Sequence, residues 1–387
     1  MSDQQTLRPA DEAELRALVA DAAASGRRLR LRGGGSKDGV GAPSTAAVVD
    51  MTAFAGVVDY DPPELVLTVR PGTPLTEIET LLAAHDQMLA FAPYDPAPLF
   101  GEPEGSATIG GTVAAGLSGS QRLTQGAARD HLLGFAAVSG RGESFIGGAK
   151  VVKNVTGYDL PKVLASSWGR LAAMTELTLK VLPRPATSLT VIAEDLSPRQ
   201  AWQAMAHCLQ SHAEVAAAAH LPAGTIGARA VTALRVQGFA PSVEARCQII
   251  EAVAHDDWCF ARTSQSAATE IWDALRTLSP LAGERALWRV SLPARYAPDF
   301  IEAVEAGDAD WLMDWAGGLV WYAGQSDAAS VRAAAARLGG HAMLMRGPEA
   351  LRASIPAFHP LNAGVAALEE RVRRAFDPAG IFETGRF

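Results

Sequence analysis

The chain has 387 residues, of which 48% are hydrophobic, and a formal net charge of −8. That length exceeds one ordinary hydrophobic core and predicts two domains. The negative charge argues against nucleic acid and anionic membrane surfaces as partners, because both require a basic face. The sequence contains no run of about 18 apolar residues, so no membrane-spanning helix is predicted. The N-terminus is polar, so no signal peptide is predicted.

The first predicted elements are a helix, a short strand and a glycine-rich loop. Asp11 and Glu14 are typical of a capping box, which predicts a helix from there to about Ser25. The apolar and basic strand 28–31 then leads into the loop 32–37, Arg-Gly-Gly-Gly-Ser-Lys. Glycines allow positive φ and close approach, and bare N–H groups beside a hydroxyl and a cation suit a pyrophosphate. A plain flexible turn is the alternative, since neither the P-loop nor the Gly-x-Gly-x-x-Gly pattern fits.

Three further clusters of small residues follow in the first half. Between them the sequence predicts short strands at 48–50 and 65–69, a helix at 74–84 and a loop at 94–105. The clusters lie at 107–116, at 126–130 before a strand at 132–138, and at 153–160 before a strand at 174–180. The small residues at 107–116 let backbone or a flat ligand come close, and a tightly packed turn and helix is the alternative.

The second half predicts two copies of a β-α-β-β-α-β unit. The first copy comprises strands at 188–193, 215–221, 230–238 and 258–262, with helices at 198–211 and 242–254. After a helix at 267–278, the second comprises strands at 287–292, 311–315, 318–323 and 341–345, with helices at 298–306 and 328–338. We expect one broad antiparallel sheet with helices on one side, followed by a last helix at 361–376.

The order and spacing of the four clusters resemble the PCMH-type FAD-binding domain of the vanillyl-alcohol oxidase superfamily, and the tail 375–386 resembles its closing motif. Within that superfamily the chain is similar to the E-subunit family of bacterial glycolate oxidases. The resemblance implies an α+β protein with a two-part PCMH-type FAD-binding domain at 1–185. A cap with duplicated ferredoxin-like units would occupy 186–346, and 347–387 would return to the FAD domain.

The resemblance also implies which residues contact FAD. They are Arg32, Gly33, Gly34, Gly35, Ser36, Lys37, Pro71, Gly72, Thr108, Ile109, Gly110, Gly111, Val113, Gly126, Arg129, Asp130, Lys153, Asn154, Gly157, Tyr158 and Asp159. For several of them a structural role stays open. Arg129 and Asp130 could form a buried ion pair, and Lys153 and Asn154 a solvated loop.

The flavin is expected to be bound non-covalently, because no histidine lies between Arg28 and Ala84 and no cysteine lies in the first half. No metal site is predicted, and the absence of Cys-x-x-Cys argues against an iron–sulfur cluster. The catalytic residues remain unknown: the metal-gathering histidine segment of catalytic relatives is missing, and in 339–346 only His341 could act as a base. The closing motif also departs from the family, with Glu383-Thr384-Gly385 where relatives tend to have Asn-Pro-Gly.

The resemblance implies the FAD-binding subunit of a glycolate, or D-2-hydroxyacid, dehydrogenase complex. Its expected partners are a catalytic FAD subunit and an iron–sulfur subunit, and the substrates of the complex are small 2-hydroxy acids such as glycolate and D-lactate. The expected location is the cytoplasm, with attachment to the inner membrane through partner subunits as a variant. Two alternatives stay open: a self-sufficient FAD-dependent 2-hydroxyacid oxidase, and a scaffold with a vestigial flavin pocket.

Overall fold

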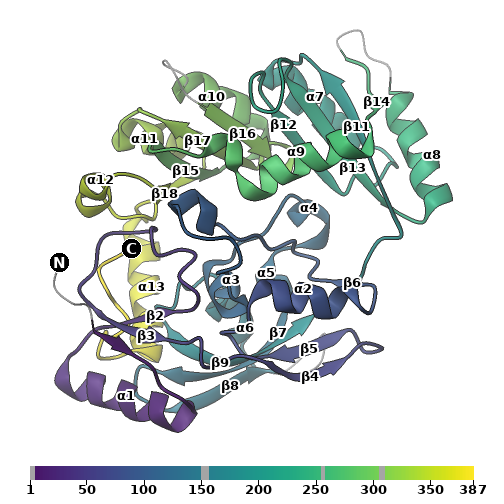
Figure 1. Ribbon diagram of the computed structural model, residues 1–387. Helices are drawn as coiled ribbons and strands as arrows, with labels where there is room; N and C mark the ends of the chain where they lie inside the picture. The colour runs from purple at the N-terminus through teal and green to yellow at the C-terminus, as the bar shows by residue number, and fades with distance from the viewer. Residues whose placement is uncertain (1–4, 150–156, 254–257, 305–309) are drawn as a thin grey trace. The chain divides into compact units, whose positions relative to one another are not determined.

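The computed structural model describes residues 5–149, 157–253, 258–304 and 310–387 (Figure 1). Its contacts divide the chain into two compact units. Unit 1 comprises Met1–Ser118, Gly126–Arg184 and Pro360–Phe387, and unit 2 comprises Gly119–Gln125 and Pro185–His359. The last residues of the chain therefore fold with the first ones. No helix of the described residues is long and apolar enough to cross a membrane.

Unit 1 is built on two main sheets with helices packed against them. The strands are β1 Thr6–Leu7, β2 Leu29–Arg32, β3 Ala47–Asp50, β4 Val57–Asp61, β5 Val66–Val69, β6 Gln87–Met88, β7 Leu132–Ser139, β8 Ser144–Gly148, β9 Ala172–Lys180 and β10 Leu182–Pro183. The helices are α1 Glu12–Ser25, α2 Leu75–Ala83, α3 Ile109–Ala115, α5 Ala128–His131, α6 Leu160–Leu164 and α13 Ala363–Phe376. Helix α4 Arg122–Gln125 follows α3 in the sequence but belongs to unit 2. The short 3-10 turn η1 Ala97–Phe100 lies in the predicted loop.

One sheet is parallel, in the order β1-β3-β2, and the other is antiparallel, in the order β4-β5-β9-β7-β8. Helix α1 begins where the sequence predicted, because the Asp11 side chain accepts a hydrogen bond from the Glu14 N–H at 2.9 Å. Its buried face packs with strand residues of both sheets and with Ile381 and Phe382 of the tail. Helices α2 and α3 pack on the antiparallel sheet in a second core.

The sequence did not predict β4 and β8, the two edge strands of the antiparallel sheet. Each pairs on one side only, so neither needs the apolar pattern of a strand buried on both sides. Val57 and Val58 in β4 are exposed, and β8 contains two glycines and an exposed Ile146. The apolar alternation that predicts a strand is therefore absent from both.

Unit 2 contains one eight-stranded antiparallel sheet. Its strands are β11 Thr187–Glu194, β12 Ala217–Leu221, β13 Val231–Gly238, β14 Ala261–Arg262, β15 Ala286–Ser291, β16 Asp310–Asp314, β17 Leu319–Gly324 and β18 His341–Arg346. The helices are α7 Pro198–Leu209, α8 Ala240–Glu251, α9 Gln265–Thr277, α10 Ala297–Val304, α11 Ala328–Arg337 and α12 Glu349–Ser354. Short 3-10 turns are η2 Ser279–Leu281, η3 Ala294–Tyr296 and η4 Trp315–Gly317.

The sheet confirms the predicted duplication and the α+β class. The order is β14-β11-β13-β12-β16-β17-β15-β18, so each half has the strand order of a ferredoxin-like unit. The halves join edge to edge where β12 pairs with β16, through His220 and Met313. Residues of α7, α8, α10 and α11 form one large core with one face of this sheet.

The expectation that all helices cover one side was wrong for α9. The Trp272 indole N–H of α9 donates to the Thr190 hydroxyl of β11 at 3.0 Å. Thr190 alternates with Val191, which belongs to the core on the other face, so α9 lies on the opposite side. Arg235 of β13 stacks on the Trp272 ring, 4.1 Å from its centre. Helix α9 lies between the two copies in the sequence and is not part of the repeated unit, so the repeat does not determine which face of the sheet it covers.

His220 makes the stability of unit 2 sensitive to acid. The side chain is buried on β12, stacks on Trp311 and shares a 2.9 Å hydrogen bond with the Thr232 hydroxyl. Burial lowers the pKa of His220 from its ordinary 6.5 to about 4. Between those two pKa values the unfolded chain binds one more proton than the native chain. The free energy of unfolding is therefore not reduced by this group above pH 6.5, and it decreases as the pH falls from 6.5 towards 4.

We predict that His220→Gln removes this acid sensitivity. The free energy of unfolding of the wild type should decrease by about 1.4 kcal/mol per pH unit more than that of the variant between pH 6 and 4.5. Urea titrations at several pH values measure the difference. The exposed His207→Gln is the control and should follow the wild type. Parallel profiles for wild type and His220→Gln would contradict the prediction.

Candidate functional site

An open cavity in unit 1 brings together segments that are far apart in the sequence. The lining residues are Leu29, Arg30, Leu31, Arg32, Gly33, Gly34, Gly35, Ser36, Lys37, Asp38, Met51, Pro71, Thr108, Gly110, Gly111, Ala114, Ala115, Trp168, Gly169, Arg170, Ala172, Ala173, Met174, Phe382, Thr384, Arg386 and Phe387. The whole glycine loop predicted from the sequence is among them.

The glycine loop packs against the segment 106–108 so closely that no side chain fits between them. A Cβ atom on Gly33 would stand 2.2 Å from the Thr108 hydroxyl oxygen, and one on Gly34 would stand 1.8 Å from the Ser106 carbonyl oxygen. Gly35 has φ +86°, in the region that favours glycine. The three glycines are thus required by the protein's own packing, and this packing presents the loop backbone to the cavity.

Lys37 places a partly dehydrated cation in the cavity wall. Its ammonium group donates to the Ser36 hydroxyl at 2.7 Å. Burial lowers the pKa of Lys37 to about 8, although the charges of Asp95 and Asp38 act in the opposite direction. A cation that has lost part of its water gains from an anionic ligand. The loop therefore offers backbone N–H groups, a hydroxyl and a cation to an anion.

Asp95, which the sequence analysis did not single out, organises the segment facing the loop. Its carboxylate accepts from the N–H groups of Ala97 at 2.9 Å, Gly105 at 2.8 Å and Ala107 at 3.1 Å. Those bonds close the proline-rich loop and fix the Ser106 carbonyl. A residue of this kind could have been found from the spacing of Asp before a Pro- and Gly-rich loop.

Helix α3 forms a second wall. Thr108 caps it by accepting from the Gly111 N–H at 3.4 Å, and Gly110 has no room for a Cβ, which would lie 2.4 Å from Pro71. A Cβ on Gly111 would meet Thr108 and Lys37 at 3.3 and 3.6 Å, beside the cavity. Small residues thus keep this wall flat.

Trp168 and Phe387 form an aromatic wall that the sequence analysis missed. Their ring centres are 5.1 Å apart. Trp168 has φ +56°, a rare conformation for a bulky residue, and the turn is held by hydrogen bonds from Ser166 N–H to Val113 and from Trp168 N–H to Ala114. Strained residues cluster at ligand sites, so this pair is a candidate contact for a flat ring.

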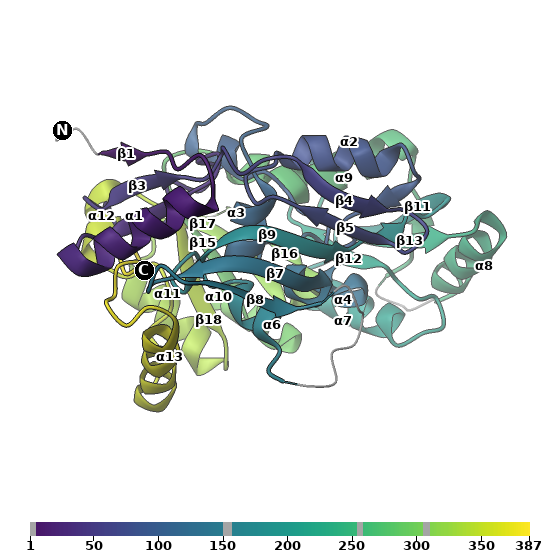
Figure 2. The same cartoon turned by 90° about the horizontal axis from the view of Figure 1, so that it is seen from below.

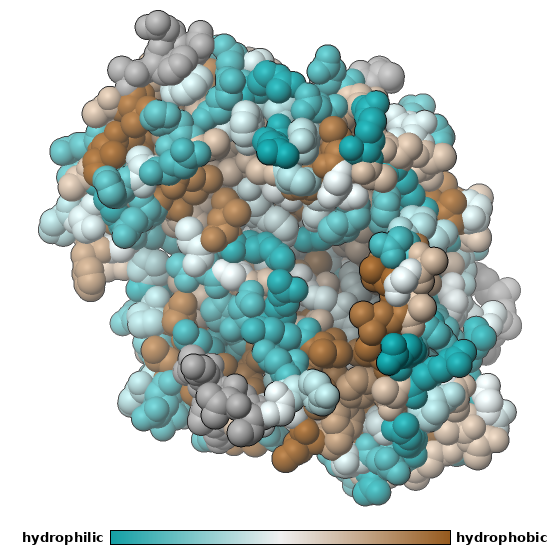
Figure 3. All heavy atoms as spheres, turned by 180° about the vertical axis from the view of Figure 1, so that it is seen from behind, coloured by the Kyte–Doolittle hydropathy of each residue, from teal (hydrophilic) through white to brown (hydrophobic). Residues whose placement is uncertain are grey.

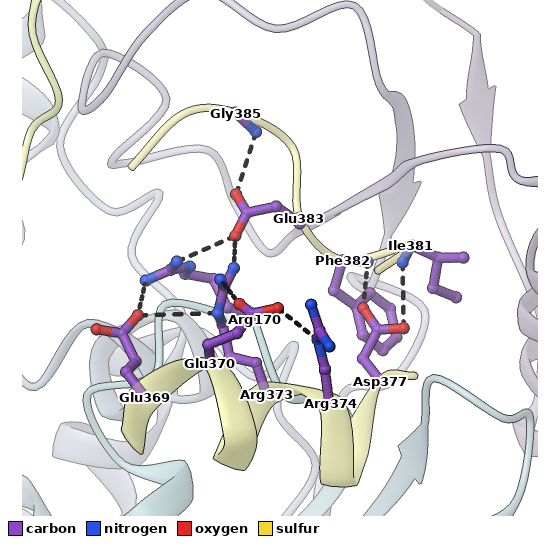
Figure 4. A network of polar contacts seen from close by, with 10 residues as sticks. All are labelled: Arg170, Glu369, Glu370, Arg373, Arg374, Asp377, Ile381, Phe382, Glu383 and Gly385. Atoms are coloured by element: carbon purple, nitrogen blue, oxygen red, sulfur yellow. Dashed lines mark hydrogen bonds and ion pairs between the residues drawn. The ribbon is translucent and has the colours of Figure 1, made fainter. Parts of the chain in front are cut away.

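The C-terminal tail reaches the cavity because ion pairs hold it down (Figure 4). Glu383 is bound by Arg170 at 3.0 Å and by Arg373. Farther on, the Arg386 guanidinium donates to the carbonyl oxygens of Asp38, at 2.9 Å, and Val40. The departure of Glu383 from the family motif therefore has a local explanation: its side chain binds arginines, whereas Thr384 and Arg386 line the cavity.

Several predicted contact residues lie elsewhere in unit 1. The cavity lining contains Arg32 to Lys37, Pro71, Thr108, Gly110 and Gly111, but not Gly72, Ile109, Val113, Gly126, Arg129, Asp130, Gly157, Tyr158 or Asp159. Ile109 and Val113 are fully buried in the core, and Tyr158 is 88% exposed. Lys153 and Asn154 lie outside the described residues.

The alternative of a buried Arg129–Asp130 ion pair is wrong. Both side chains are substantially exposed, with the closest nitrogen and oxygen atoms 3.9 Å apart. Asp130 instead accepts from the Ala127 N–H at 2.8 Å and closes the turn before β7. His341, the one predicted candidate base, is the first residue of β18 in unit 2. Burial and the charges of Arg289 and His359 lower the pKa of His341, which favours its neutral form.

No group of three or more His, Cys, Asp or Glu side chains that could hold a metal is found in the part of the chain that the structure describes. The cavity, by contrast, fits a dinucleotide with a pyrophosphate and flat rings. The dehydrated Lys37 and the glycine backbone suit the phosphates, and Trp168 and Phe387 suit a ring.

The family described as FAD binding domain matches residues 4–146. The chain is 31% identical over 360 residues to glycolate oxidase subunit GlcE of Escherichia coli (strain K12), covering 92% of each protein. It is 32% identical over 168 residues to a D-lactate dehydrogenase of Anaerostipes hadrus, covering 43% of this chain and 32% of that one. A solved alkyldihydroxyacetonephosphate synthase has the same fold, with a TM-score of 0.69 and 14% identity over 97% of this chain and 75% of the other. The cofactor is FAD.

We predict that acid releases this FAD. The cavity lining contains neither histidine nor cysteine, the side chains that would most readily form a covalent flavin bond. After precipitation of the purified protein with trichloroacetic acid, the yellow flavin should be in the supernatant and run with authentic FAD in chromatography. Flavin that stays with the pellet after proteolysis, attached to a peptide, would contradict the prediction.

Proposed function

The chain belongs to the family of bacterial glycolate oxidase E subunits and is an FAD-dependent oxidoreductase, and from that premise we propose that it is the FAD-binding subunit of a multi-subunit glycolate, or D-2-hydroxyacid, dehydrogenase complex. The observation that carries the proposal is the cavity of unit 1, where the glycine loop and Lys37 meet the C-terminal tail. A catalytic flavoprotein and an iron–sulfur subunit are its partners in this proposal.

Different residues of the cavity suit different parts of the cofactor. The backbone of Gly33, Gly34 and Gly35 with Ser36 and Lys37 binds the pyrophosphate in this proposal, because these groups supply N–H donors and a cation. Trp168 and Phe387 hold a flat ring. Thr108, Gly110 and Gly111 leave room for close approach along α3. When bound, FAD supplies a ring that accepts the electrons removed from a hydroxy acid.

The proposal of partner subunits rests on the residues of the chain. Oxidation of a 2-hydroxy acid needs a base at the hydroxyl and a cation at the carboxylate. Segment 339–346 supplies one histidine, His341, and the sequence contains no Cys-x-x-Cys for an iron–sulfur relay. The proposed location is the cytoplasm, where such a complex meets its small organic acids.

We predict that FAD affinity falls as the pH rises above about 8. Below that pH Lys37 is protonated in the free protein, and above it binding of the anionic pyrophosphate must also take up a proton. The dissociation constant should therefore increase by up to about tenfold per pH unit until the bound-state pKa is reached. Titration of the apoprotein with FAD between pH 6.5 and 9.5, followed by flavin fluorescence, measures it.

Two substitutions separate the charge of Lys37 from other effects of pH. Lys37→Arg keeps a cation at all these pH values and should remove the slope. Lys37→Met should weaken FAD by about 10- to 100-fold at pH 7, the range of a charged hydrogen bond, with no slope above pH 8. Lys162→Met, at a half-exposed lysine of α6, is the control. Wild-type affinity in Lys37→Met would place the pyrophosphate elsewhere.

We predict that the isolated chain oxidises neither glycolate nor D-lactate at a useful rate, because segment 339–346 contains a single histidine and the sequence lacks the metal-gathering histidine segment of catalytic relatives. Anaerobic mixing with each substrate, monitored at the visible flavin band, measures the reaction. Bleaching only after the catalytic and iron–sulfur subunits are added is the expected result. Rapid bleaching of the lone chain would favour the self-sufficient oxidase, and a purified chain without flavin would favour the vestigial pocket.

A further inference from the structure

Lys37 brings an ammonium group into the cavity without a carboxylate to pair with it. Its half-buried side chain belongs to the cavity lining, and among the described residues no carboxylate lies within ion-pair distance of its Nζ atom. The two carboxylates whose charges act on Lys37 are bound elsewhere. Asp38 pairs with Arg32 at 3.0 Å, and Asp95 accepts from three backbone N–H groups. The fold therefore leaves this cation in the cavity without a direct neutralising partner, which favours the loss of its proton.

Loss of that proton turns the side chain into a nucleophile, because only a neutral amine has a lone pair that can attack a carbonyl carbon. Burial lowers the pKa of Lys37 from its ordinary 10.5 to about 8. At about pH 7.5 roughly a quarter of the Lys37 side chains are then neutral, against about a thousandth for a lysine with the ordinary pKa. The Ser36 hydroxyl, 2.7 Å from the Nζ atom, fixes the position of this nitrogen beside the loop. Lys37 is therefore a positioned and activated amine.

The glycine loop presents donors for a phosphate next to this amine. Among the described residues no backbone hydrogen bond uses the N–H groups of Gly34, Gly35 or Ser36, and a run of unused N–H groups suits phosphate oxygens. Helix α3 and strand β9 form another part of the cavity wall; they share one core and lie next to each other in Figure 2. Both contribute only small or apolar side chains to the lining. The cavity therefore has room for a small acyl group beside Lys37.

Lysine is rare in this chain, so Lys37 has few competitors for an acyl group. Hydrophilic residues are spread over the face of the molecule seen in Figure 3, but most cations of the chain are arginines. Of the 34 basic residues in the sequence, 29 are arginines and five are lysines, and arginine does not lose its proton in proteins. Lys162 of α6 represents an ordinary surface lysine, because it is half exposed and pairs with Asp159 at 3.1 Å.

We propose that Lys37 of the FAD-free chain is a site of acylation by acyl phosphates, the mixed anhydrides of a carboxylic acid and phosphoric acid. The phosphate binds to the N–H groups of the glycine loop, and the Lys37 amine attacks the acyl carbon. A C–N bond forms, the C–O bond to the phosphate breaks, one proton leaves the nitrogen, and inorganic phosphate departs. An acyl phosphate suits the cavity better than a coenzyme A thioester, because its acyl carbon and its phosphorus share one oxygen atom. In the thioester a long arm separates the acyl carbon from the phosphates.

The acylated chain cannot load FAD. The amide is neutral and longer than the lysine side chain, so the loop loses its cation and the acyl group fills part of the cavity. Bound FAD in turn covers Lys37 and protects the loaded chain. Acylation therefore controls whether an FAD-free chain takes up its cofactor, an inference that rests on the proposed function because it needs the pyrophosphate at the glycine loop.

The test treats the full-length chain, with and without bound FAD, with acetyl phosphate and follows each lysine by mass spectrometry of its peptides. In the FAD-free chain at about pH 7.5, Lys37 should be acetylated at least about tenfold faster than Lys162, because more of its amine is neutral. Its rate should level off above about pH 8, and bound FAD or inorganic phosphate should slow the reaction of Lys37 alone. Equal rates at Lys37 and Lys162, or a faster reaction of Lys37 with acetyl coenzyme A, would overturn the proposal.

FAD titrations of the treated proteins test the effect on cofactor loading. The treated wild type should bind FAD at least about tenfold more weakly, the effect of losing a charged hydrogen bond, and untreated Lys37→Gln, which is neutral like the amide, should bind it as weakly. Treated Lys37→Arg should keep its affinity, whereas the matched control Lys162→Arg should lose affinity like the wild type.

The outcomes separate this inference from the proposed function. If Lys37→Gln binds FAD weakly but Lys37 is not acetylated faster than Lys162, only the acylation is overturned. If Lys37 is acetylated rapidly but FAD neither slows the reaction nor binds more weakly afterwards, the proposed position of the pyrophosphate fails, and the control of cofactor loading fails with it. Loss of FAD affinity in treated Lys37→Arg would also overturn the inference, because the reactive group would then lie elsewhere.

Discussion

The contact between the glycine loop and the segment 106–108 is the constraint on which the cavity of unit 1 depends. The Ser106 carbonyl and the Thr108 hydroxyl occupy the space where side chains at Gly34 and Gly33 would stand. Because Asp95 fixes that segment through three N–H groups, the loop has a rigid surface to rest on. The result is an exposed row of backbone donors ending at Lys37, whose ammonium is left poor in water and ready for an anion.

The tail completes this arrangement from the other end of the chain. The Asp377 carboxylate accepts from the N–H groups of Ile381 at 3.1 Å and Phe382 at 2.8 Å, which turns the chain after α13. Glu383 then forms ion pairs with Arg170 and Arg373. Arg386 donates hydrogen bonds to backbone carbonyls of the segment that follows the glycine loop. The same ion-pair network that brings the tail to the cavity also anchors α13 (Figure 4).

The sheet of unit 2 carries polar side chains on the face opposite its main core, among them Arg235 of β13 and Asp314 of β16. The segment 119–125, which follows the cavity helix α3 in sequence, is bound to that face: the Ser120 hydroxyl donates to Asp314 at 2.8 Å and the Trp315 indole N–H to the Gly119 carbonyl at 3.0 Å. Burial raises the pKa of Asp314 to about 6. A buried carboxylate held in this way is costly unless its hydrogen bonds are kept, which favours a single position for the segment.

Local patterns in the sequence determined the elements that are buried on both sides, the duplicated β-α-β-β-α-β order and the glycine loop, because periodicity and glycine requirements are written into short stretches of chain. The edge strands β4 and β8 were not predicted from the sequence, because pairing on one side only imposes no such pattern. Only the tertiary structure decided which clusters meet: it brought Trp168, Arg170, Arg386 and Phe387 to the cavity and left Arg129, Asp130 and Tyr158 outside its lining. Those choices follow from long-range packing and ion pairs, such as Glu383 with Arg170, between residues more than two hundred positions apart, which no local pattern encodes.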